Sequence, residues 1–316
     1  MKRLSLRPII LIAADLILLL ISIAAVLLVR DRAMILVHPP RLPVSVLPES
    51  AGFTIYETVT LQTEDGIDLR AWYMPPDEEG AAVIYVHGLG GNRQLMLEQA
   101  AAVYRYGYGA LLLDLRSHGE SGGEISTLGY YEPRDVRAAL DFLLAQPEVN
   151  PERIGIFGES LGAITAIRAA AQMPELRAVV AQSAFTSIEE NVASGVRQIT
   201  GLPPFPFAPL VIFFGEIETG LNIGQVRPVD EIGQIAPRAI LLMHGGQDTL
   251  LASDNSQRLY DAAGEPKALI YFPEAGHSGL QESDPDLWER SVAGFFDRYL
   301  REIESDAIVP NTARGD

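Results

Sequence analysis

The chain contains no cysteine among its 316 residues. This absence excludes disulfides, thiolate nucleophiles and cysteine-ligated metal or iron–sulfur centres. Basic residues are also scarce, 24 against 41 acidic ones, so the net charge is −17 at pH 7. A surface of this charge repels nucleic-acid phosphates, so we expect no nucleic-acid partner. It also disfavours binding to anionic lipids through clustered basic residues. With 48% hydrophobic and 21% charged residues, the composition is otherwise that of a globular protein.

One apolar stretch departs from this average. Residues 8–29 read PIILIAADLILLLISIAAVLLV, a run of 22 residues with a single charge, Asp15. A helix of this length can cross the ~30 Å hydrocarbon core of a bilayer. A cleaved signal peptide is the alternative, since residues 22–24 (SIA) offer a small-residue cleavage site. The apolar run continues past that site and is longer than an ordinary signal core, so we predict an uncleaved transmembrane helix over 8–29.

The orientation of this helix follows from weaker signals. Basic residues flank it almost equally on both sides, so the positive-inside rule discriminates little. Because only seven residues precede the helix, we expect a single-pass protein with its N-terminus inside and its main domain extracytoplasmic. The predicted divisions are a short N-terminal tail (1–7), the transmembrane helix (8–29), a proline-rich spacer (30–50), the main domain (51–303) with an insertion at about 186–236, and a C-terminal tail (304–316).

Short apolar runs alternate with helical patterns along the main domain. The first two runs, 54–62 and 67–74, are joined by a glycine-containing turn and predict an antiparallel hairpin. Later runs are continuously apolar, which is typical of strands buried on both faces of a parallel sheet. We therefore predict an α/β fold with a mainly parallel sheet flanked by helices. The later strands are expected at 82–86, 110–113, 154–157, 178–181, 239–243 and 268–272, and the helices at 94–106, 133–144, 161–172, 253–263 and 285–302.

A long insertion separates the strand that ends near Ala181 from the strand that begins at Ala239. Part of it, residues 202–214, reads LPPFPFAPLVIFF and is too short to span a membrane. The insertion is either a small helical subdomain with its own core or a lid over a functional site. Loops of this length in compact domains usually have a function, so we favour a lid. Five of its apolar side chains are expected to line a substrate pocket: Phe205, Phe207, Ile212, Phe213 and Phe214.

The sharpest motif is GESLG at residues 158–162, which follows an apolar strand and opens a helical run. In this strand–turn–helix context a G-x-S-x-G motif is a nucleophile elbow, with the serine on a tight turn and its hydroxyl exposed. Gly158 and Gly162 let chain segments approach without a Cβ clash. The helix N-terminus directs amides and the positive end of its dipole at the site. The motif therefore predicts Ser160 as a nucleophile.

A serine nucleophile needs a base, and the base needs an orienting group. His277 lies in a glycine-rich loop after the final strand, and Asp248 follows the penultimate strand. Open α/β sheets place their sites at the carboxyl ends of strands, where both residues and Ser160 are expected. We therefore predict His277 as the base and Asp248 as the orienting carboxylate. An ordinary role as turn residues is the alternative for both.

An oxyanion formed by such a nucleophile needs two backbone N–H donors. We expect one from Leu161, the residue after the nucleophile. The other should come from the loop after the strand 82–86, which reads HGLGGN, and there we assign Leu89. The side chain of Leu89 has no part in this role, because its backbone N–H group is the donor to the oxyanion. This set of groups requires no metal and no organic cofactor, and we expect none.

Successive motifs give the chain a clear resemblance to α/β-hydrolase-fold serine hydrolases, in particular their serine-aminopeptidase-like and lysophospholipase-like branch. The likeness covers about residues 54–302 and implies the α/β-hydrolase fold, with the chain order Ser160, Asp248, His277 expected of it. The resemblance also implies a structural turn network around Arg116 rather than a catalytic role. Ser117 is a departure, since the family usually has glycine there. The matching motifs are DGIDLRAWYMP (65–75), HGLG (87–90), DLRSHGES (114–121), GESLG (158–162), HGGQD (244–248) and GH (276–277).

The resemblance and the N-terminal apolar run together imply a membrane-anchored serine hydrolase, and the apolar insertion implies an apolar acyl pocket. We expect it to cleave a small-molecule or lipid-like carboxylic ester or thioester with an apolar acyl group, through an acyl-enzyme. Peptide or amide hydrolysis and acyl transfer use the same groups and stay open, because a fold does not decide among them. A non-catalytic binding protein is a further alternative, which the complete triad disfavours. The oligomeric state stays open.

Overall fold

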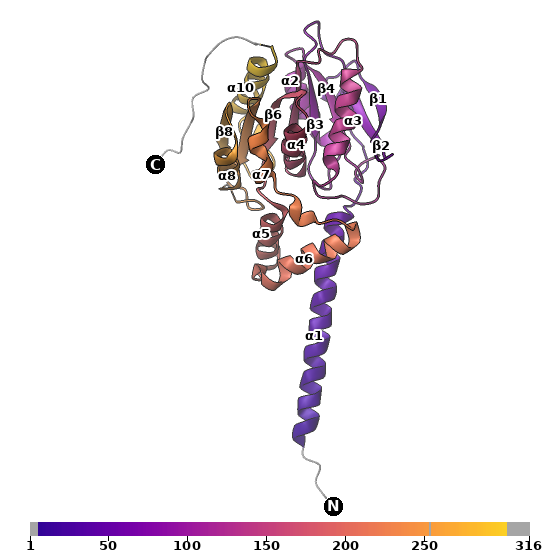
Figure 1. Cartoon of the computed structure of the whole chain (residues 1–316), viewed down its shortest axis with the longest axis vertical. Helices are drawn as coiled ribbons and strands as arrows, with labels where there is room; N and C mark the ends of the chain where they lie inside the picture. Colours follow the sequence, from indigo (N-terminus) through magenta and orange to yellow (C-terminus); the bar gives the residue numbers. More distant parts are fainter. Residues whose placement is uncertain (1–5, 253, 302–316) are drawn as a thin grey trace, which may run out of the picture.

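The structure is a computed structural model that describes residues 6–252 and 254–301. The predicted C-terminal tail (304–316), the last residues of the main domain (302–303) and most of the N-terminal tail lie outside the described residues. The described chain forms a sheet domain, an insertion beneath it, and a long helix that projects away from both (Figure 1).

An eight-stranded sheet forms the centre of the main domain, in the order β1-β2-β4-β3-β5-β6-β7-β8. The pairs β1–β2 and β2–β4 are antiparallel, and all other neighbours are parallel. This is the mainly parallel sheet led by a hairpin that the apolar runs predict. The strands are β1 (Glu57–Gln62), β2 (Asp68–Met74), β3 (Ala82–Val86), β4 (Gly109–Leu113), β5 (Ile154–Glu159), β6 (Leu176–Gln182), β7 (Ala239–Gly245) and β8 (Lys267–Phe272).

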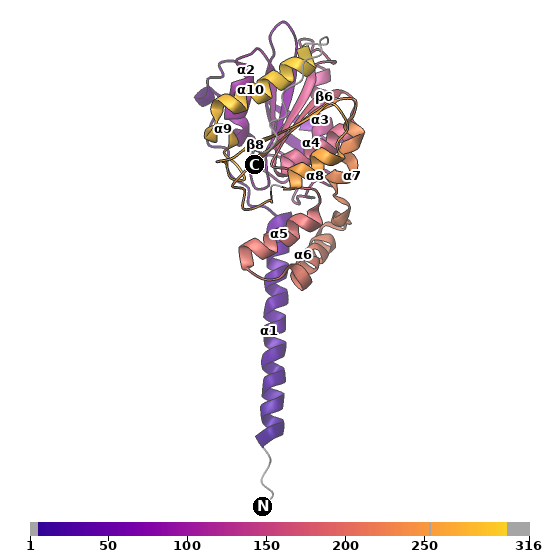
Figure 2. The ribbon, with the colours of Figure 1, turned by 90° about the vertical axis from the view of Figure 1, so that its left-hand side faces the viewer.

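Helices cover both faces of the sheet (Figure 2). Side chains of α3, α4 and α8 pack on one face, and those of α2 and α10 pack on the other, so the core has two layers. The predicted α/β fold is therefore confirmed. The helices of the domain are α2 (Leu97–Tyr104), α3 (Glu132–Leu144), α4 (Leu161–Gln172), α8 (Asp254–Ala262), α9 (Leu280–Ser283) and α10 (Pro285–Phe296), with a π-helical turn at Asp297–Arg301.

The N-terminal helix α1 runs from Leu6 to Val37, beyond the predicted end at residue 29. The charged residues 30–32 do not end it, because Val29, Ala33 and Val37 form an i, i+4 row that is buried against the insertion. The helix ends just before Pro39, where a proline disfavours helical geometry in the residue that precedes it. The predicted span 8–29 therefore covers the part of α1 that precedes the charges at 30–32, and the helix itself continues to Val37.

Residues 38–50 do not form the separating spacer predicted for this region, because they dock on the sheet domain. The Arg41 guanidinium donates hydrogen bonds to the carbonyl oxygens of Ser121 and Gly123. The Asn92 side chain donates to the Leu42 carbonyl oxygen at 3.0 Å, and the Gln94 side-chain oxygen accepts from backbone amides of this segment. The proline-rich segment therefore fastens α1 to the domain instead of separating the two.

The insertion between β6 and β7 packs around the end of α1, below the sheet (Figures 1 and 2). Its first helix, α5, begins after Ser187, whose hydroxyl accepts a hydrogen bond from the amide of Glu190 and caps the helix. The second helix, α6, packs against both α5 and α1. The insertion is thus a small helical layer that shares its core with α1. Its helices are α5 (Ile188–Thr200), α6 (Pro204–Thr219) and α7 (Pro228–Glu231).

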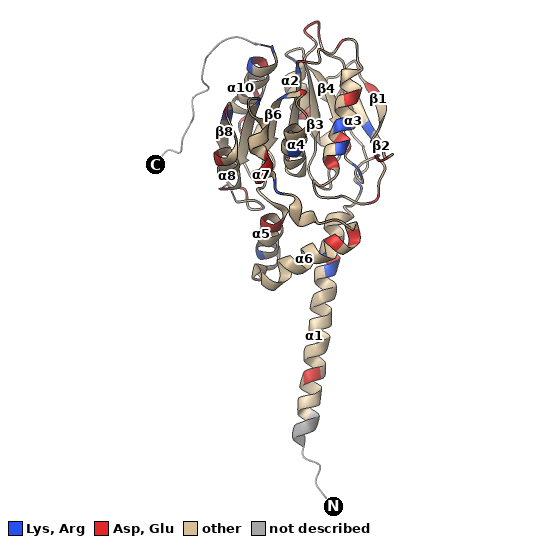
Figure 3. Ribbon diagram, viewed as in Figure 1, with Lys and Arg blue, Asp and Glu red and all other residues tan. Residues whose placement is uncertain are grey.

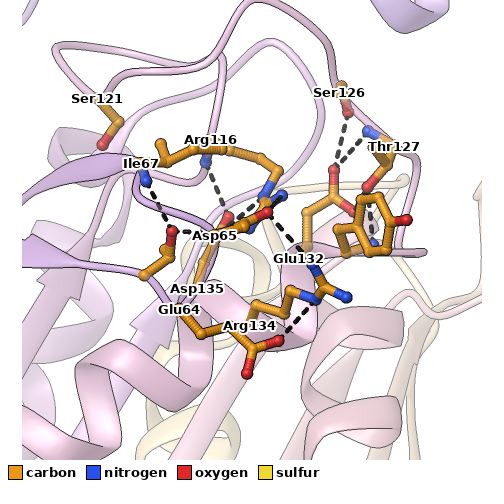
Figure 4. Close-up of polar contacts among 12 residues, drawn as sticks. Glu64, Asp65, Ile67, Arg116, Ser121, Ser126, Thr127, Glu132, Arg134 and Asp135 are labelled. Carbon is orange, nitrogen blue, oxygen red and sulfur yellow. Dashed lines mark hydrogen bonds and ion pairs between the residues drawn. The ribbon is translucent and has the colours of Figure 1, made fainter. Parts of the chain in front are cut away.

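Arg116 anchors the turn that follows β4 (Figure 4). Its guanidinium pairs with Asp135 of α3 at 2.7 Å and with Asp65 of the β1–β2 turn at 2.9 Å. Arg116 and Asp135 are almost fully buried, so each charge needs the other. The network ties the antiparallel hairpin to α3, in keeping with the structural role that the resemblance implies.

Ser117, next to this network, has the backbone conformation of a glycine. Its φ is +61°, its side chain is buried, and its hydroxyl has no hydrogen-bond partner among residues 6–252 and 254–301. A Cβ in the left-handed region costs about 1–2 kcal/mol. We expect Ser117→Gly to raise the free energy of unfolding by about 1 kcal/mol, because glycine's greater freedom in the unfolded chain offsets part of the gain. Urea denaturation measures this change.

Ser117→Ala is the matched control, since it removes the unpaired hydroxyl but keeps the Cβ. If the strained backbone costs more free energy than the unpaired hydroxyl, the glycine variant is the more stable of the two. Equal stability of the two variants would mean that the buried hydroxyl, and not the backbone, carries the cost.

Candidate active site

Ser160 lies at the junction of β5 and α4, on the tight turn that GESLG predicts. Its φ of 55° and ψ of −113° are unusual for a residue with a side chain. A Cβ on Gly158 would lie 2.1 Å from the carbonyl oxygen of Gly162, and a Cβ on Gly162 would lie 2.0 Å from that of Val86. The two glycines are therefore required by close backbone approach, and they let the turn present Ser160.

The structure brings the three predicted side chains into one hydrogen-bonded chain. The Oγ of Ser160 lies 2.9 Å from Nε2 of His277, and Nδ1 of His277 lies 2.8 Å from Oδ2 of Asp248. Ser160 follows β5, Asp248 follows β7 and His277 follows β8, so the parallel strands deliver all three to one edge. This geometry allows His277 to take the Ser160 proton while Asp248 holds the imidazole.

The carboxylate side chain of Asp248 is completely buried and accepts several hydrogen bonds. Burial alone would raise its pKa, but hydrogen bonds from His244, His277 and the Leu251 amide outweigh that effect and hold the pKa below its usual range. His244, which sequence reasoning left unassigned, places Nε2 3.2 Å from Oδ2 of Asp248, and its Nδ1 lies 2.8 Å from the Ser256 hydroxyl. Asp248 therefore stays ionised while it accepts the hydrogen bond from Nδ1 of His277.

Two further contacts position the His277 loop, and neither was expected from the sequence. The Ser183 hydroxyl donates to the His277 carbonyl oxygen at 2.7 Å. The Ser278 hydroxyl donates to the carboxylate of Glu159 at 2.6 Å, next to the nucleophile. Burial raises the pKa of Glu159, and the Ser278 hydrogen bond opposes the rise. These contacts connect the loop that carries His277 to the ends of β5 and β6. They help to hold His277 at its distance from Ser160.

The two predicted oxyanion donors lie in the expected places. Leu161 is the first residue of α4. A Cβ on Gly88 would lie 3.3 Å from Cβ of Ser160, so the loop that carries Leu89 lies against the nucleophile. Neither amide donates a hydrogen bond to protein in the described part of the chain. Burial lowers the pKa of the adjacent His87 to about 3, and this neutral ring contacts the Gly88 carbonyl oxygen at 2.7 Å and orients the loop.

Ser160 and His277 open into a cavity of about 1070 Å³. Its size suits a long apolar ligand, since small-molecule sites usually span about 300–1,000 Å³. The insertion supplies one wall, so it covers the site as the predicted lid does. The residues of the insertion that line the cavity come mainly from α5. They are Ile188, Asn191, Val192, Gly195, Val196 and Thr200 of α5, Leu202 after it, and Phe207 and Val211 of α6.

The predicted pocket residues need a correction, because Phe207 alone of the five lines this cavity. Phe205, Ile212 and Phe213 face a separate hollow of about 390 Å³ between α5 and α6, and Phe214 packs on the core. Helical geometry explains the difference: Phe207 and Val211 are four residues apart and share the face toward Ser160. Ile212 and Phe213 lie on other faces of α6, and Phe205 is outside regular helical geometry. Phe214 is seven residues after Phe207 and shares its face, but it lies about 10 Å further along the axis and packs on the core there.

An unexpected wall of the cavity comes from α1. Side chains from Ala25 to Leu36 line it, although Ser160, Asp248 and His277 lie more than a hundred residues further along the chain. The N-terminal helix is therefore part of the site and not only an appendage. Since α1 is apolar on every side, its sequence pattern gave no sign of this role.

The fold and this arrangement define an enzyme of the serine-hydrolase type with the α/β-hydrolase fold. A family model described as X-Pro dipeptidyl-peptidase (S15 family) matches residues 55–201. The chain is 34% identical over 262 residues to the uncharacterized protein Rv2307c of Mycobacterium tuberculosis, with 82% of each chain covered. The chain belongs to the same α/β-hydrolase family as that protein, and the resemblance read from its motifs is confirmed.

Two further proteins are similar to this chain. The esterase Pf2001 of Pyrococcus furiosus superimposes with a TM-score of 0.71 and 27% identity, covering 84% of this chain and 98% of the esterase. The polyketide transferase ATR5 of Stachybotrys chlorohalonatus is 24% identical over 291 residues, covering 78% of this chain and 98% of the transferase. The expectation of an α/β-hydrolase enzyme is therefore confirmed, while the substrate is not fixed by these likenesses.

Proposed function

We propose that the protein is a membrane-anchored serine hydrolase that cleaves carboxylic esters or thioesters with an apolar acyl group. The observation that carries this proposal is the Ser160–His277–Asp248 chain opening into a large cavity lined mainly by apolar side chains. The likeness to an esterase of known structure supports ester chemistry. Such a cavity binds an acyl chain by burying its surface, at about 25 cal/mol per Å².

In this proposal Ser160 Oγ attacks the carbonyl carbon while His277 Nε2 takes its proton. The amides of Leu89 and Leu161 stabilise the oxyanion, and Asp248 stabilises the imidazolium. The tetrahedral intermediate then collapses, the bond to the leaving oxygen or sulfur breaks, and the leaving group takes the proton from His277. Water, deprotonated by His277, attacks the acyl-enzyme and releases the acid and Ser160.

Peptide hydrolysis is the second candidate, because the matching family model is a peptidase and the carboxylates of Glu159 and Glu282 line the cavity. Acyl transfer is favoured by the likeness to a polyketide transferase. One set of assays separates ester hydrolysis, peptide hydrolysis and acyl transfer. The substrates are p-nitrophenyl octanoate, an Xaa-Pro p-nitroanilide, and p-nitrophenyl octanoate with an added alcohol as acyl acceptor. We expect hydrolysis of the octanoate ester. Cleavage of the anilide at a higher kcat/KM, or an ester product from the alcohol, would replace the proposal.

Phe207 should set the preference for long acyl chains. Phe207→Ala is expected to lower the octanoyl-to-acetyl ratio of kcat/KM about ten- to two-hundredfold, the effect of losing about 1–3 kcal/mol of apolar contact. Phe213→Ala is the matched control, because Phe213 lies on the same helix, is 53% exposed and lines a different hollow. An equal loss in both variants would mean that α6 acts through its packing and not through this contact.

The anchoring part of the proposal rests on Ile10–Val37, a stretch long enough to span a membrane, in which an 18-residue window has a mean hydropathy of 2.9. A signal sequence has the same features, so the test is extraction. We expect the protein to stay in membranes after carbonate washing and to be accessible to protease from outside the cell. A mature N-terminus near Ala25 in mass spectrometry would show a cleaved signal peptide instead.

A further inference from the structure

The N-terminal helix lines the cavity with one face while it has the length of a membrane span. Its lining residues recur at the spacing of three and four that places side chains on one side of a helix. The cavity that holds Ser160 therefore continues down the side of α1. These lining residues are Ala25, Leu28, Val29, Arg32, Ile35 and Leu36.

Charges mark where the bilayer boundary crosses α1. Residues 8–29 include one charge, whereas Arg30, Asp31 and Arg32 follow in succession at the top of the uncharged stretch (Figure 3). Charged residues at the end of an apolar run belong at the level of the headgroups. Ala25 precedes Arg32 by about two turns, or about 10 Å along the axis. The lower end of the cavity wall is therefore on the hydrocarbon side of that boundary.

The end of the insertion farthest from the sheet is uncharged as well. No charged residue occurs from residue 198 to 215, which covers the end of α5 and most of α6. Figures 1 and 2 place this end beside α1, on the side away from the sheet. Leu202, Phe205 and Phe213 are 40%, 78% and 53% exposed there. An apolar patch of this kind marks an interaction surface, and its place beside α1 identifies the bilayer as what covers it.

The rim of the cavity is apolar too. Leu42, Leu89, Leu95 and Leu250 line it and remain more than one third exposed. Side chains of this kind do not favour a charged or strongly hydrated substrate. They add exposed apolar side chains to the cavity wall between α1 and the loop that carries Leu89.

We propose that the cavity opens sideways into the bilayer and that the substrate is a membrane-resident lipid ester or thioester that enters along α1. This inference rests on the hydrolase function proposed above and names its substrate class. The acyl chain lies against Ala25 and Leu28 at hydrocarbon depth while its carbonyl reaches Ser160. The chain never has to enter water, so the hydrophobic cost of extracting a lipid is avoided.

The test uses the full-length protein reconstituted in phosphatidylcholine vesicles. The probes are 4-methylumbelliferyl oleate in the same bilayer and the water-soluble 4-methylumbelliferyl acetate. Ala25→Trp places an indole on the cavity wall and should lower the oleate-to-acetate rate ratio at least about tenfold. Ala24→Trp is the matched control, because Ala24 is exposed and does not line the cavity, and it should keep the ratio of the wild type.

The ratios and fluorophosphonate labelling of Ser160 distinguish the two levels of the proposal. Suppose that Ala25→Trp and Ala24→Trp are both labelled by the fluorophosphonate and both keep the wild-type oleate-to-acetate rate ratio. This result would overturn entry along α1 and leave the hydrolase function in place. Absence of labelling and of hydrolysis in the wild type would remove the hydrolase function and this inference with it. A second measurement needs no variant: moving the oleate ester into separate vesicles should abolish most of the initial rate. Equal rates from the same and separate vesicles would overturn the inference.

Discussion

Replacing Ser160 with alanine should abolish ester hydrolysis, with a loss of about 10⁶ in kcat. The hydroxyl of Ser160 lies 2.9 Å from Nε2 of His277 and opens into the cavity, so it is the atom placed to form an acyl-enzyme. Without this oxygen the amides of Leu89 and Leu161 can still polarise a carbonyl. They then assist only direct attack by water, which is slow.

Three measurements check this result. We expect no fluorophosphonate labelling of Ser160→Ala, no turnover of p-nitrophenyl octanoate, and an unchanged circular dichroism spectrum, because alanine retains the Cβ that the turn already accommodates at φ 55°. Ser194→Ala on α5 is a suitable control, since Ser194 is not among the described residues that line the cavity and its hydroxyl accepts a hydrogen bond from the Gln198 side chain. Full labelling of the Ser160→Ala protein would place the nucleophile at another serine.

The three triad residues could be predicted from the sequence because the topology of the sheet determines where they lie. Ser160, Asp248 and His277 each follow the end of a parallel strand by no more than five residues, and parallel strands end at one edge. Continuous apolar runs identify such strands without knowledge of the tertiary contacts. The strand–turn–helix context of GESLG then selects one serine among many. Local patterns therefore carry most of the information about this edge of the sheet.

The cavity walls formed by α6 and α1 could not be predicted in the same way, because these two helices lack a polar face over the stretches that line the cavity. Residues 202–214 are all apolar or proline, so no periodicity shows that Phe207 faces Ser160 while Phe213 faces away. The same holds for the apolar run of α1, whose lining role depends on a tertiary contact with the insertion. Burial on such helices is decided by packing partners.

The groups that support His277 were missed for a different reason. Ser183 contacts the His277 carbonyl oxygen at 2.7 Å, and no local pattern connects these two residues. His244 lies 3.2 Å from Oδ2 of Asp248. A serine after a strand is common and has many uses, so nothing in its neighbourhood specifies such a partner. His244 was treated as an ordinary histidine at a strand end, although it belongs to the same HGGQD motif as Asp248. Spacing alone did not reveal that both nitrogens of His244 are engaged.

Asp248 is surrounded by donors on both carboxylate oxygens, which makes an amide replacement informative. Its Oδ1 accepts hydrogen bonds from the amides of Leu250 and Leu251, both at 2.8 Å. Its Oδ2 accepts from His277 at 2.8 Å and lies 3.2 Å from Nε2 of His244. Backbone amides cannot become acceptors, so an asparagine here keeps its oxygen toward them. Its NH2 group must then face the histidines.

Asp248→Asn should therefore lower kcat by about 10⁴ while the protein stays folded. The asparagine NH2 donates to Nδ1 of His277, which moves the ring proton to Nε2, and that nitrogen can then no longer accept the proton of Ser160. The measurement is kcat for p-nitrophenyl octanoate. Glu274→Gln is the matched control, because this nearby carboxylate makes its hydrogen bond to Gln247 and should be dispensable. Near-wild-type kcat in Asp248→Asn together with a large loss in Glu274→Gln would transfer the orienting role to Glu274.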